Sequence, residues 1–215
     1  LKMINDCGGD AYCSGHTIMV NPQKYNHSIK YIESDWSSIS YLFLSFLFSD
    51  LEEIVIENVN SNSVQGDISL VNFFAVLGVK SIFHNNCVKL TKHNIVLPEK
   101  INWDLESIPD LCQTFIVACL GLGIELTARG IRSLYFKETN RLNAMKQELL
   151  KFNSQLDVLD NSITLYPTIW NKNKTIILNT YGDHRMALSF STLVLLNQNI
   201  IIENYHVINK SYPNF

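Results

Sequence analysis

The sequence lacks the short motifs of several common enzyme classes. It contains no glycine-rich phosphate loop, no GxSxG and no HExxH, which argues against a P-loop nucleotide site, a serine hydrolase elbow and a zinc protease helix. Its cysteines form no CxxC pair and show no Cys/His ligand spacing, so we expect no metal and no cofactor. We interpret this odd, scattered set as reduced, buried thiols of a cytoplasmic protein. The cysteines are Cys7, Cys13, Cys87, Cys112 and Cys119.

The sequence also lacks a strong charge of either sign and long apolar runs. Charged residues make up 17% of the 215 residues and the formal net charge is -3, so we expect no nucleic-acid partner. The apolar runs at 41–48 and 115–124 are shorter than the roughly 20 residues that cross a bilayer. We therefore expect no membrane partner and predict that these runs form buried helices. The hydrophobic content of 47% suffices for one full core, or one core and part of another.

A long internal repeat organises the chain. Asp35, Asp110 and Asp183 each follow a β-type run and precede a predicted buried helix, at spacings of 75 and 73 residues. Another β-type run follows each of these helices. The pattern indicates one structural unit that occurs three times.

A second landmark repeats in step with the first. Each later β-type run leads to a polar turn, and Gln65, Lys137 and Lys210 occupy these turns at spacings of 72 and 73 residues. The period is longer than that of a solenoid repeat, so we predict an α+β fold of repeated βαβαββ units that share one core. The third unit is expected to be incomplete, because its second helix would start near Ser211 or Pro213, just where the sequence ends.

The repeat also predicts how the chain divides into domains. Residues 34–215 form one C-terminal domain that lacks its last elements. Residues 1–33 fit the last helix and hairpin of a preceding N-terminal domain. Because the sequence begins at Leu1 and stops in SYPNF, we expect it to be part of a larger protein.

The starts of the repeated helices indicate an anion site. Aspartate is a favoured helix N-cap, so Asp35, Asp110 and Asp183 are each predicted to begin a helix. In a threefold pseudo-symmetric core these helix starts converge at one end. Exposed N–H groups and the helix dipole make such an end favourable for an anion.

The segment KETNR, residues 137–141, places unusual charges where a helix is predicted to begin. Lys137 and Arg141 are four residues apart and Glu138 and Arg141 are three apart, so all three can share one face of the first turn. The simpler interpretation is a solvated helix start with a weak ion pair. Two cations at a helix N-terminus oppose the dipole, however, which favours an anionic ligand between them.

The segment DHR, residues 183–185, repeats this arrangement at another predicted helix start. The Arg185 guanidinium can bind both oxygens of a carboxylate or phosphate at once. His184 has an unperturbed pKa that would allow proton transfer near neutral pH. A lone histidine or lysine at such a place is usually a surface residue. Only their positions in the repeat make His184 and Lys210 candidate site residues.

Two repeat positions have simpler structural interpretations. Asp110 is by default only a helix cap, although it could accept a proton from a substrate hydroxyl if it faces Glu138 and His184. Gln65 holds the first copy of the lysine position without a cation, and there we favour a structural role.

Three longer stretches resemble the C-terminal half of EPSP synthase, the 3-phosphoshikimate 1-carboxyvinyltransferase family. They are KETNRLNAMKQEL at 137–149, YGDHRMALSF at 181–190 and KSYPNF at 210–215. Three shorter segments lie in the matching order: ESDWSSISY at 33–41, SVQGD at 63–67 and IPD at 108–110. The resemblance implies two inverse α/β barrel domains of three βαβαββ units each, which close on 3-phosphoshikimate and phosphoenolpyruvate. It also implies transfer of the enolpyruvyl group to the substrate 5-hydroxyl by addition, followed by elimination of phosphate.

The resemblance implies a role for each matched residue. Asp110 would bind the shikimate hydroxyls and take the proton of the attacking one, beside Lys137 and Ser133, which would be substrate-binding. Glu138 would protonate and deprotonate the methylene carbon of phosphoenolpyruvate.

The remaining matched residues would hold phosphoenolpyruvate. Arg141 and Arg185 would bind its carboxylate, Lys210 its phosphate, and His184 would act in the same pocket as a catalytic residue.

Some features depart from the family pattern. Asn140 stands where aspartate is usual, and Tyr135 where arginine is common. The ligands that the family takes from its N-terminal domain are absent from this sequence, so we expect half an active site that is inactive alone. Two alternatives remain: an enzyme like UDP-N-acetylglucosamine enolpyruvyl transferase, or a non-catalytic half-domain that binds anions.

Overall fold

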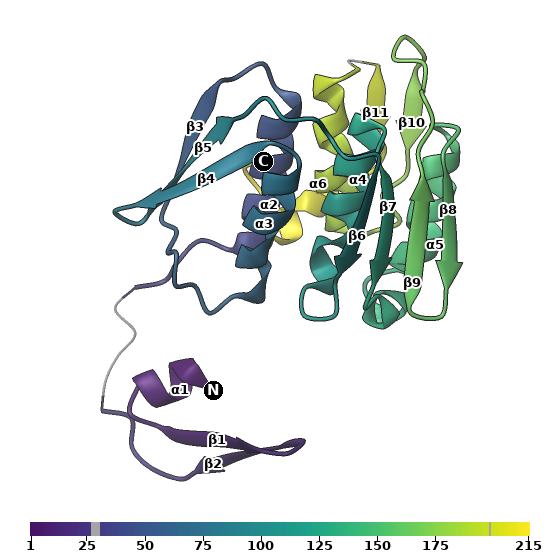
Figure 1. The fold of residues 1–215 in the computed structure, drawn as a ribbon. Coiled ribbons are helices and arrows are strands. Elements are labelled where there is room, and N and C mark those ends of the chain that lie inside the picture. Colours follow the sequence, from purple (N-terminus) through teal and green to yellow (C-terminus); the bar gives the residue numbers. More distant parts are fainter. Residues whose placement is uncertain (27–30, 198) are drawn as a thin grey trace.

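The computed structural model describes residues 1–26, 31–197 and 199–215. Within these ranges, no helix is both long enough and apolar enough to cross a membrane. Sheets lie on the outside of the main body and enclose helices, as Figure 1 shows. The main body contains three consecutive units, which correspond to the three copies of the predicted repeat.

The first unit contains two helices and a three-stranded antiparallel sheet of order β3-β5-β4. Its first helix, α2, has eight buried side chains among 13 residues, as expected of a core helix. Residues 31–35 form no strand, so the strand predicted before Asp35 is absent there, and residues 27–30 lie outside the described residues. The elements are α2 (Trp36–Phe48), β3 (Glu53–Glu57), α3 (Leu70–Val76), β4 (Val79–His84) and β5 (Cys87–Lys92).

The second unit shows the predicted βαβαββ order in full. Its four-stranded sheet has the order β6-β7-β9-β8, with β6 parallel to β7 and the other pairs antiparallel. The part β7-β9-β8 repeats the order β3-β5-β4 of the first unit, which confirms the repeat. The elements are β6 (Lys100–Asp104), α4 (Cys112–Leu122), β7 (Glu125–Arg129), α5 (Arg141–Leu150), β8 (Gln155–Leu159) and β9 (Ser162–Tyr166).

The third unit repeats the first elements of the second. Strands β10 (Ile176–Leu178) and β11 (Ile200–Ile202) pair in parallel on either side of α6 (His184–Ser191) in the sequence, as β6 and β7 do around α4. The next element is a 3-10 helix over Tyr205–Lys210. Residues 211–215 are irregular, so the described part of the third unit lacks a second helix, as expected of an incomplete copy of the repeat.

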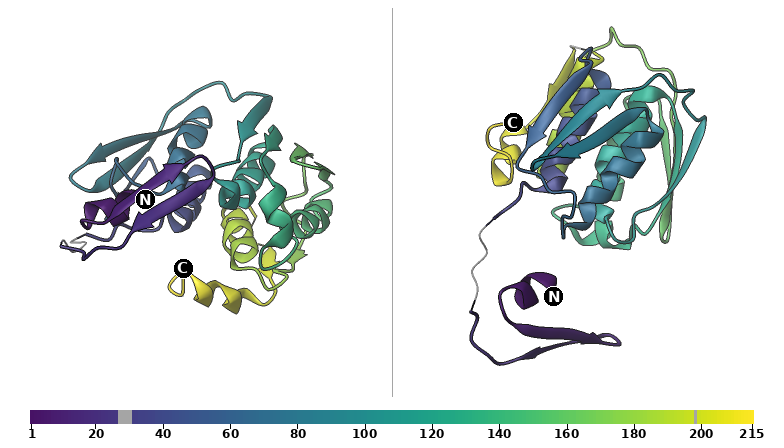
Figure 2. Two further views of the ribbon diagram at one scale, coloured as in Figure 1. Left: turned by 90° about the horizontal axis from the view of Figure 1, so that it is seen from below. Right: turned by 60° about the vertical axis from the view of Figure 1, so that its left-hand side comes forward.

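Helices α2, α4 and α6 pack against one another and form the centre of the core. Every residue of α4 from Cys112 to Leu120 is buried, which confirms the prediction of a helix buried on nearly all sides. The rings of Phe73 and Phe115 stack in this core with their centroids 3.6 Å apart. Figure 2 shows these helices between the sheets in two further views.

The N-terminal segment contains the helix and hairpin predicted for residues 1–33. Helix α1 (Lys2–Asp6) precedes the antiparallel strands β1 (Asp10–Ser14) and β2 (Thr17–Asn21). All the strand residues except Ala11 are exposed. The assignment of this segment to a preceding domain remains a prediction. One expectation is wrong here: Cys13 is exposed, and only Cys112 and Cys119 are buried thiols.

Candidate active site

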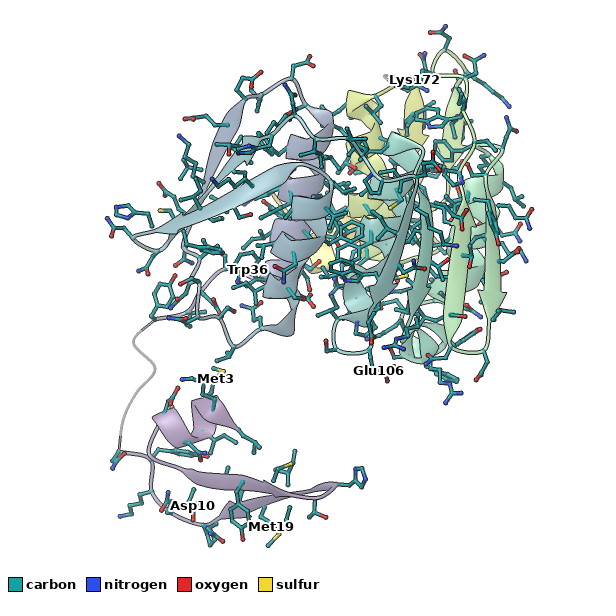
Figure 3. The ribbon with its side chains drawn as sticks, in the orientation of Figure 1. Met3, Asp10, Met19, Trp36, Glu106 and Lys172 are labelled. Carbon is teal, nitrogen blue, oxygen red and sulfur yellow. The ribbon has the colours of Figure 1, made fainter. Side chains whose placement is uncertain are left out.

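The starts of α2 and α4 lie at the same end of the main body. Figure 3 shows Trp36 at the first turn of α2 and Glu106 in the loop that leads from β6 to α4. The start of α6 joins them, because the Arg185 guanidinium lies 3.4 Å from a carboxylate oxygen of Asp110. The predicted convergence of helix starts is therefore confirmed for the described part of the chain.

Asp183 begins α6 and faces inward. One carboxylate oxygen accepts a hydrogen bond from the Arg185 backbone N–H at 2.8 Å, as a helix cap does. The other accepts from Nε of Arg141 at 2.6 Å, and the side chain is fully buried. Sequence reasoning assigned Asp183 only the cap. The signal in the sequence for its second role, the binding of Arg141, was its position beside His184 and Arg185 in the DHR segment.

Arg141 is the central cation of the site. It is only 1% exposed, and each of its three guanidinium nitrogens donates to a different carboxylate. Nε meets Asp183, Nη1 meets Asp110 at 2.7 Å, and Nη2 meets Glu138 at 2.8 Å. Such a network tolerates burial because every charge has an opposite neighbour. The anion that offsets the charge of Arg141 is therefore supplied by the protein itself.

The helix predicted to contain Lys137 and Glu138 begins later. Asn140 caps α5 by accepting a hydrogen bond from the Asn143 N–H, and the first helical residue is Arg141. Lys137 and Glu138 thus lie in the turn before the helix, which is a correction to the sequence prediction. The core-facing stripe of Leu142 and Met145 is buried as expected.

Asp110 is not a helix cap. It lies within a short 3-10 helix, Pro109–Leu111, and the residue before α4 makes no side-chain cap. Its carboxylate instead meets Nζ of Lys137 at 3.1 Å, besides Arg141 and Arg185. Burial alone would raise the pKa of Asp110, but the charges of Arg185, Lys137 and Arg141 lower it below the usual value. Asp110 is therefore ionised at neutral pH and able to accept a proton.

Glu138 connects the second unit to the 3-10 helix of the third. One oxygen accepts from Nζ of Lys210 at 2.5 Å and the other from Arg141. The hydrogen bond from Lys210 is the largest cause that lowers the pKa of Glu138 to about 2. In this arrangement Glu138 is a carboxylate and cannot donate a proton.

His184 lies at the edge of this cluster and is 6% exposed. Its Nδ1 is 4.0 Å from Glu138 and 3.8 Å from Asp183, too far for a hydrogen bond. Burial is the main cause that lowers the pKa of His184, so the imidazole is neutral at pH 7. The ordinary pKa assumed from the sequence does not apply.

Two buried nitrogens of the site have no partner among the described residues: Nδ1 of His184 and Nε of Arg185. Buried polar atoms without a partner are uncommon in folded proteins. These two lie on consecutive residues at the start of α6, beside Glu138 and Asp110. The α6 start therefore retains hydrogen-bonding capacity for a further polar group.

Ser133 is the one predicted site residue that the structure does not bring into the cluster. It lies in the 3-10 helix Arg132–Phe136, is exposed, and makes no side-chain hydrogen bond with the described part of the chain. Sequence reasoning missed Tyr41. Burial has the larger effect on the pKa of the Tyr41 hydroxyl and raises it overall, although the positive charge of Arg185 lowers this pKa. A tyrosine inside an apolar helix gives little signal in a sequence.

The described residues contain no group of three histidine, cysteine, aspartate or glutamate side chains that could hold a metal ion. The chemistry that this arrangement offers is ionic. Three cations and three carboxylates lie at the converging helix starts, and Lys210 adds a fourth cation at the exposed side.

Comparison with known proteins identifies the family. The family model described as EPSP synthase (3-phosphoshikimate 1-carboxyvinyltransferase) matches residues 1–215. The chain belongs to the EPSP synthase family. The resemblance seen in the KETNR, DHRMA and KSYP segments is thereby confirmed.

Curated EPSP synthases are similar over nearly the whole chain. The 3-phosphoshikimate 1-carboxyvinyltransferase of Bacteroides fragilis is 33% identical over all of this chain and 53% of its own length. That of Buchnera aphidicola subsp. Cinara cedri is 30% identical over 95% of this chain and 44% of its own. The chain thus spans about half the length of these relatives.

Two solved structures share the fold. EPSP synthase from Acinetobacter baumannii superimposes with a TM-score of 0.68 at 17% identity, over 99% of this chain and 51% of that one. The enolpyruvyl transferase NikO from Streptomyces tendae gives a TM-score of 0.58 at 15% identity, over 98% of this chain and 49% of that one. These similarities confirm the α+β fold class, with sheets around buried helices.

Proposed function

We propose that this chain carries the C-terminal half of an active site that transfers the enolpyruvyl group of phosphoenolpyruvate to the 5-hydroxyl of 3-phosphoshikimate and releases phosphate. The observation that carries the proposal is the cluster of Asp110, Lys137, Glu138, Arg141 and Arg185 at the converging helix starts. These are the residues matched by the EPSP synthase motifs. Both substrates are multiply charged anions, which such a cluster of cations suits.

The reaction assigns the two carboxylates different tasks. The 5-hydroxyl oxygen bonds to C2 of phosphoenolpyruvate, its proton passes to Asp110, and C3 gains a proton from Glu138. Return of a proton from C3 to Glu138 and departure of phosphate then restore the double bond. Asp110 suits the first task by its charge and its place beside Lys137, although its lowered pKa makes it a weaker base than a free aspartate.

Glu138 needs a change of partners before it can serve C3. While Lys210 donates to it, its pKa of about 2 prevents it from acting as an acid. The phosphate of phosphoenolpyruvate would attract Lys210 and so raise the pKa of Glu138. In the same way, the substrate carboxylate would replace the carboxylates that now hold Arg141 and would meet Arg185, while His184 would line the pocket.

The chain supplies only half of such a site. Because it spans about half the length of its relatives, we infer that the remaining ligands belong to an N-terminal domain, to which residues 1–33 would lead and against which 34–215 would close. The cysteine pattern supports a cytoplasmic location. We place Ser133 on the substrate side of the site only because the family resemblance implies it, from its position four residues before Lys137.

A non-catalytic half-domain is the second candidate. It is favoured by the pairing of Arg141, Lys137 and Lys210 with the protein's own carboxylates, which leaves the cluster satisfied without substrate. The fold similarity to the enolpyruvyl transferase NikO is equally compatible with transfer of the enolpyruvyl group to an acceptor other than 3-phosphoshikimate. UDP-N-acetylglucosamine is the acceptor to compare with 3-phosphoshikimate.

Phosphate release tests the proposal. The assay contains phosphoenolpyruvate and 3-phosphoshikimate, with the chain alone, with a separately produced N-terminal half of the Bacteroides fragilis relative, and with both. Activity only in the mixture, lost in Glu138→Ala, is the expected result. Activity of the chain alone would refute the half-site. No activity from halves shown to associate would favour the non-catalytic half-domain, and activity only with UDP-N-acetylglucosamine would change the substrate.

A further inference from the structure

Glu148 is a fully buried carboxylate outside the cluster described above. It lies on α5 and is 0% exposed. Its Oε1 accepts from the Tyr181 hydroxyl at 2.8 Å, and its Oε2 accepts from the Asn179 N–H at 3.0 Å and from Nζ of Lys151 at 2.8 Å. A buried charge is costly unless it is paired and hydrogen-bonded, and here both oxygens are used.

Two of these donors belong to the turn that precedes α6. Tyr181 has φ +53 and Gly182 has φ +73, so two consecutive residues adopt the left-handed conformation. A bulky non-glycine residue at positive φ is unfavourable by itself and persists where its surroundings hold it. The Tyr181 N–H also donates to the Asn179 side chain at 2.7 Å. The bonds to Glu148 hold this turn in place.

Helix α5 is therefore bound to the start of α6 at two points. Arg141, in its first turn, binds Asp183. Glu148, seven residues later and so on the same face, binds the turn of Asn179 and Tyr181. The Arg141–Asp183 contact is buried and the hydrogen bonds to Glu148 are partly buried, and together they link α5 to the segment that carries Asp183, His184 and Arg185.

We propose that Glu148 and Tyr181 are positioning residues that hold the His184–Arg185 pair in register with Arg141 and Glu138. The part of this inference that concerns substrate rests on the proposed function. Neither residue touches the reacting atoms in this proposal. They act because a displacement of about 1 Å between binding groups is enough to weaken a site that must meet one anion from several elements.

The test uses two properties of this chain, one of which needs no substrate. The variant is Tyr181→Phe, which removes only the hydroxyl of a side chain that is 37% exposed. Tyr166→Phe is the matched control, because Tyr166 is 43% exposed and its hydroxyl makes no hydrogen bond among the described residues. Glu148→Gln is the stronger second variant, since its amide would face the donors of Asn179 or Lys151.

The first measurement is the pKa of His184, followed by NMR of its ring protons. Release of the turn would expose the imidazole, which is now surrounded by Asp183, Arg185, Glu138 and Lys210. We expect its pKa to rise toward the ordinary value in Tyr181→Phe and to remain unchanged in Tyr166→Phe. A purely stabilising role for the hydroxyl would lower the unfolding midpoint without moving this titration.

The second measurement is the dissociation constant for phosphoenolpyruvate, at a temperature where all variants are folded. We expect it to rise about 10-fold or more in Tyr181→Phe and at least as much in Glu148→Gln. An unchanged His184 titration in both variants would refute the positioning role. If His184 shifts but the parent chain binds no phosphoenolpyruvate, the positioning role is supported and the proposed function is not.

Discussion

The first and later units use the same repeat position for different purposes. Gln65 in the first unit accepts a hydrogen bond from the Trp36 N–H at 2.8 Å and donates to the Ser34 carbonyl at 3.0 Å. Lys137 and Lys210, at the equivalent places, meet the carboxylates of Asp110 and Glu138. In the first copy a neutral side chain forms hydrogen bonds with backbone groups, whereas in the other two copies a cation faces the site.

The carboxylates of these units differ in the same way. Asp67 of the first unit is hydrogen-bonded to Ser37, and burial raises its pKa. The pKa values of Asp110 and Glu138 are lowered instead, by the cations around them. The fold thus repeats a backbone arrangement, and only the cations turn two of its copies into a candidate site.

The largest effect is expected from Arg141→Met. It would leave Asp183 buried without its cation, and removal of one partner from a buried ion pair costs about 3–5 kcal/mol. Urea unfolding would measure the free energy. The control is Gln65→Ala, for which the loss of neutral hydrogen bonds is expected to cost only about 1–2 kcal/mol. Equal losses in the two variants would contradict the distinction between the units.

The next effect concerns anion binding. Arg185→Ala is expected to weaken phosphoenolpyruvate binding by 10-fold or more, because a charge-assisted hydrogen bond contributes about 1.5–3 kcal/mol. Gln65→Ala should leave the affinity unchanged. Isothermal titration calorimetry at one salt concentration measures both. If Gln65→Ala weakens binding as much as Arg185→Ala, the first unit also belongs to the site.

The pH dependence of the two kinds of carboxylate should have opposite signs. Glu138 has a lowered pKa of about 2, so its contribution to stability is present above the unfolded pKa and is lost as the pH falls toward 2. Asp67 has a raised pKa, so its contribution falls as the pH rises from the unfolded pKa through the folded one. Carboxyl-carbon NMR titrations would measure both values.

Lys210→Met sharpens this result. It removes the largest cause of the low pKa of Glu138, so the pKa should rise toward the ordinary value of about 4.3, while that of Asp67 should not change. A Glu138 titration that stays near 2 in this variant would show that its backbone hydrogen bond and the charge of Arg141 account for the shift without Lys210.

The smallest effect is expected from Asn140→Asp. Both residues cap helices well, and the added charge at the start of α5 should stabilise by about 0.3–1 kcal/mol through the helix dipole. The change would show as a small increase in the urea midpoint. Destabilisation instead would mean that the carboxylates around Arg141 repel the new charge. Asn140→Ala, which removes the cap, is the matched comparison.

The sequence predicted the fold better than it predicted the contacts of the site. The repeat of Asp35 and Asp183 correctly predicted two capped, buried helices, since capping and apolar periodicity are local properties. Asp110 fits the same spacing but caps nothing. The βαβαββ succession of elements in the second unit was predicted from the same repeat, whereas the absence of a strand at 31–35 was not.

By itself, the sequence determined which side chains are candidates, because the motif residues and their repeat positions can be read along the chain. Only the tertiary structure decided their partners. Arg141 meets Asp110 and Asp183 across 31 and 42 residues, and Lys210 meets Glu138 across 72. Charges that distant in the chain interact only after the core has packed, and that packing gives Arg141 three carboxylates and Glu138 its low pKa.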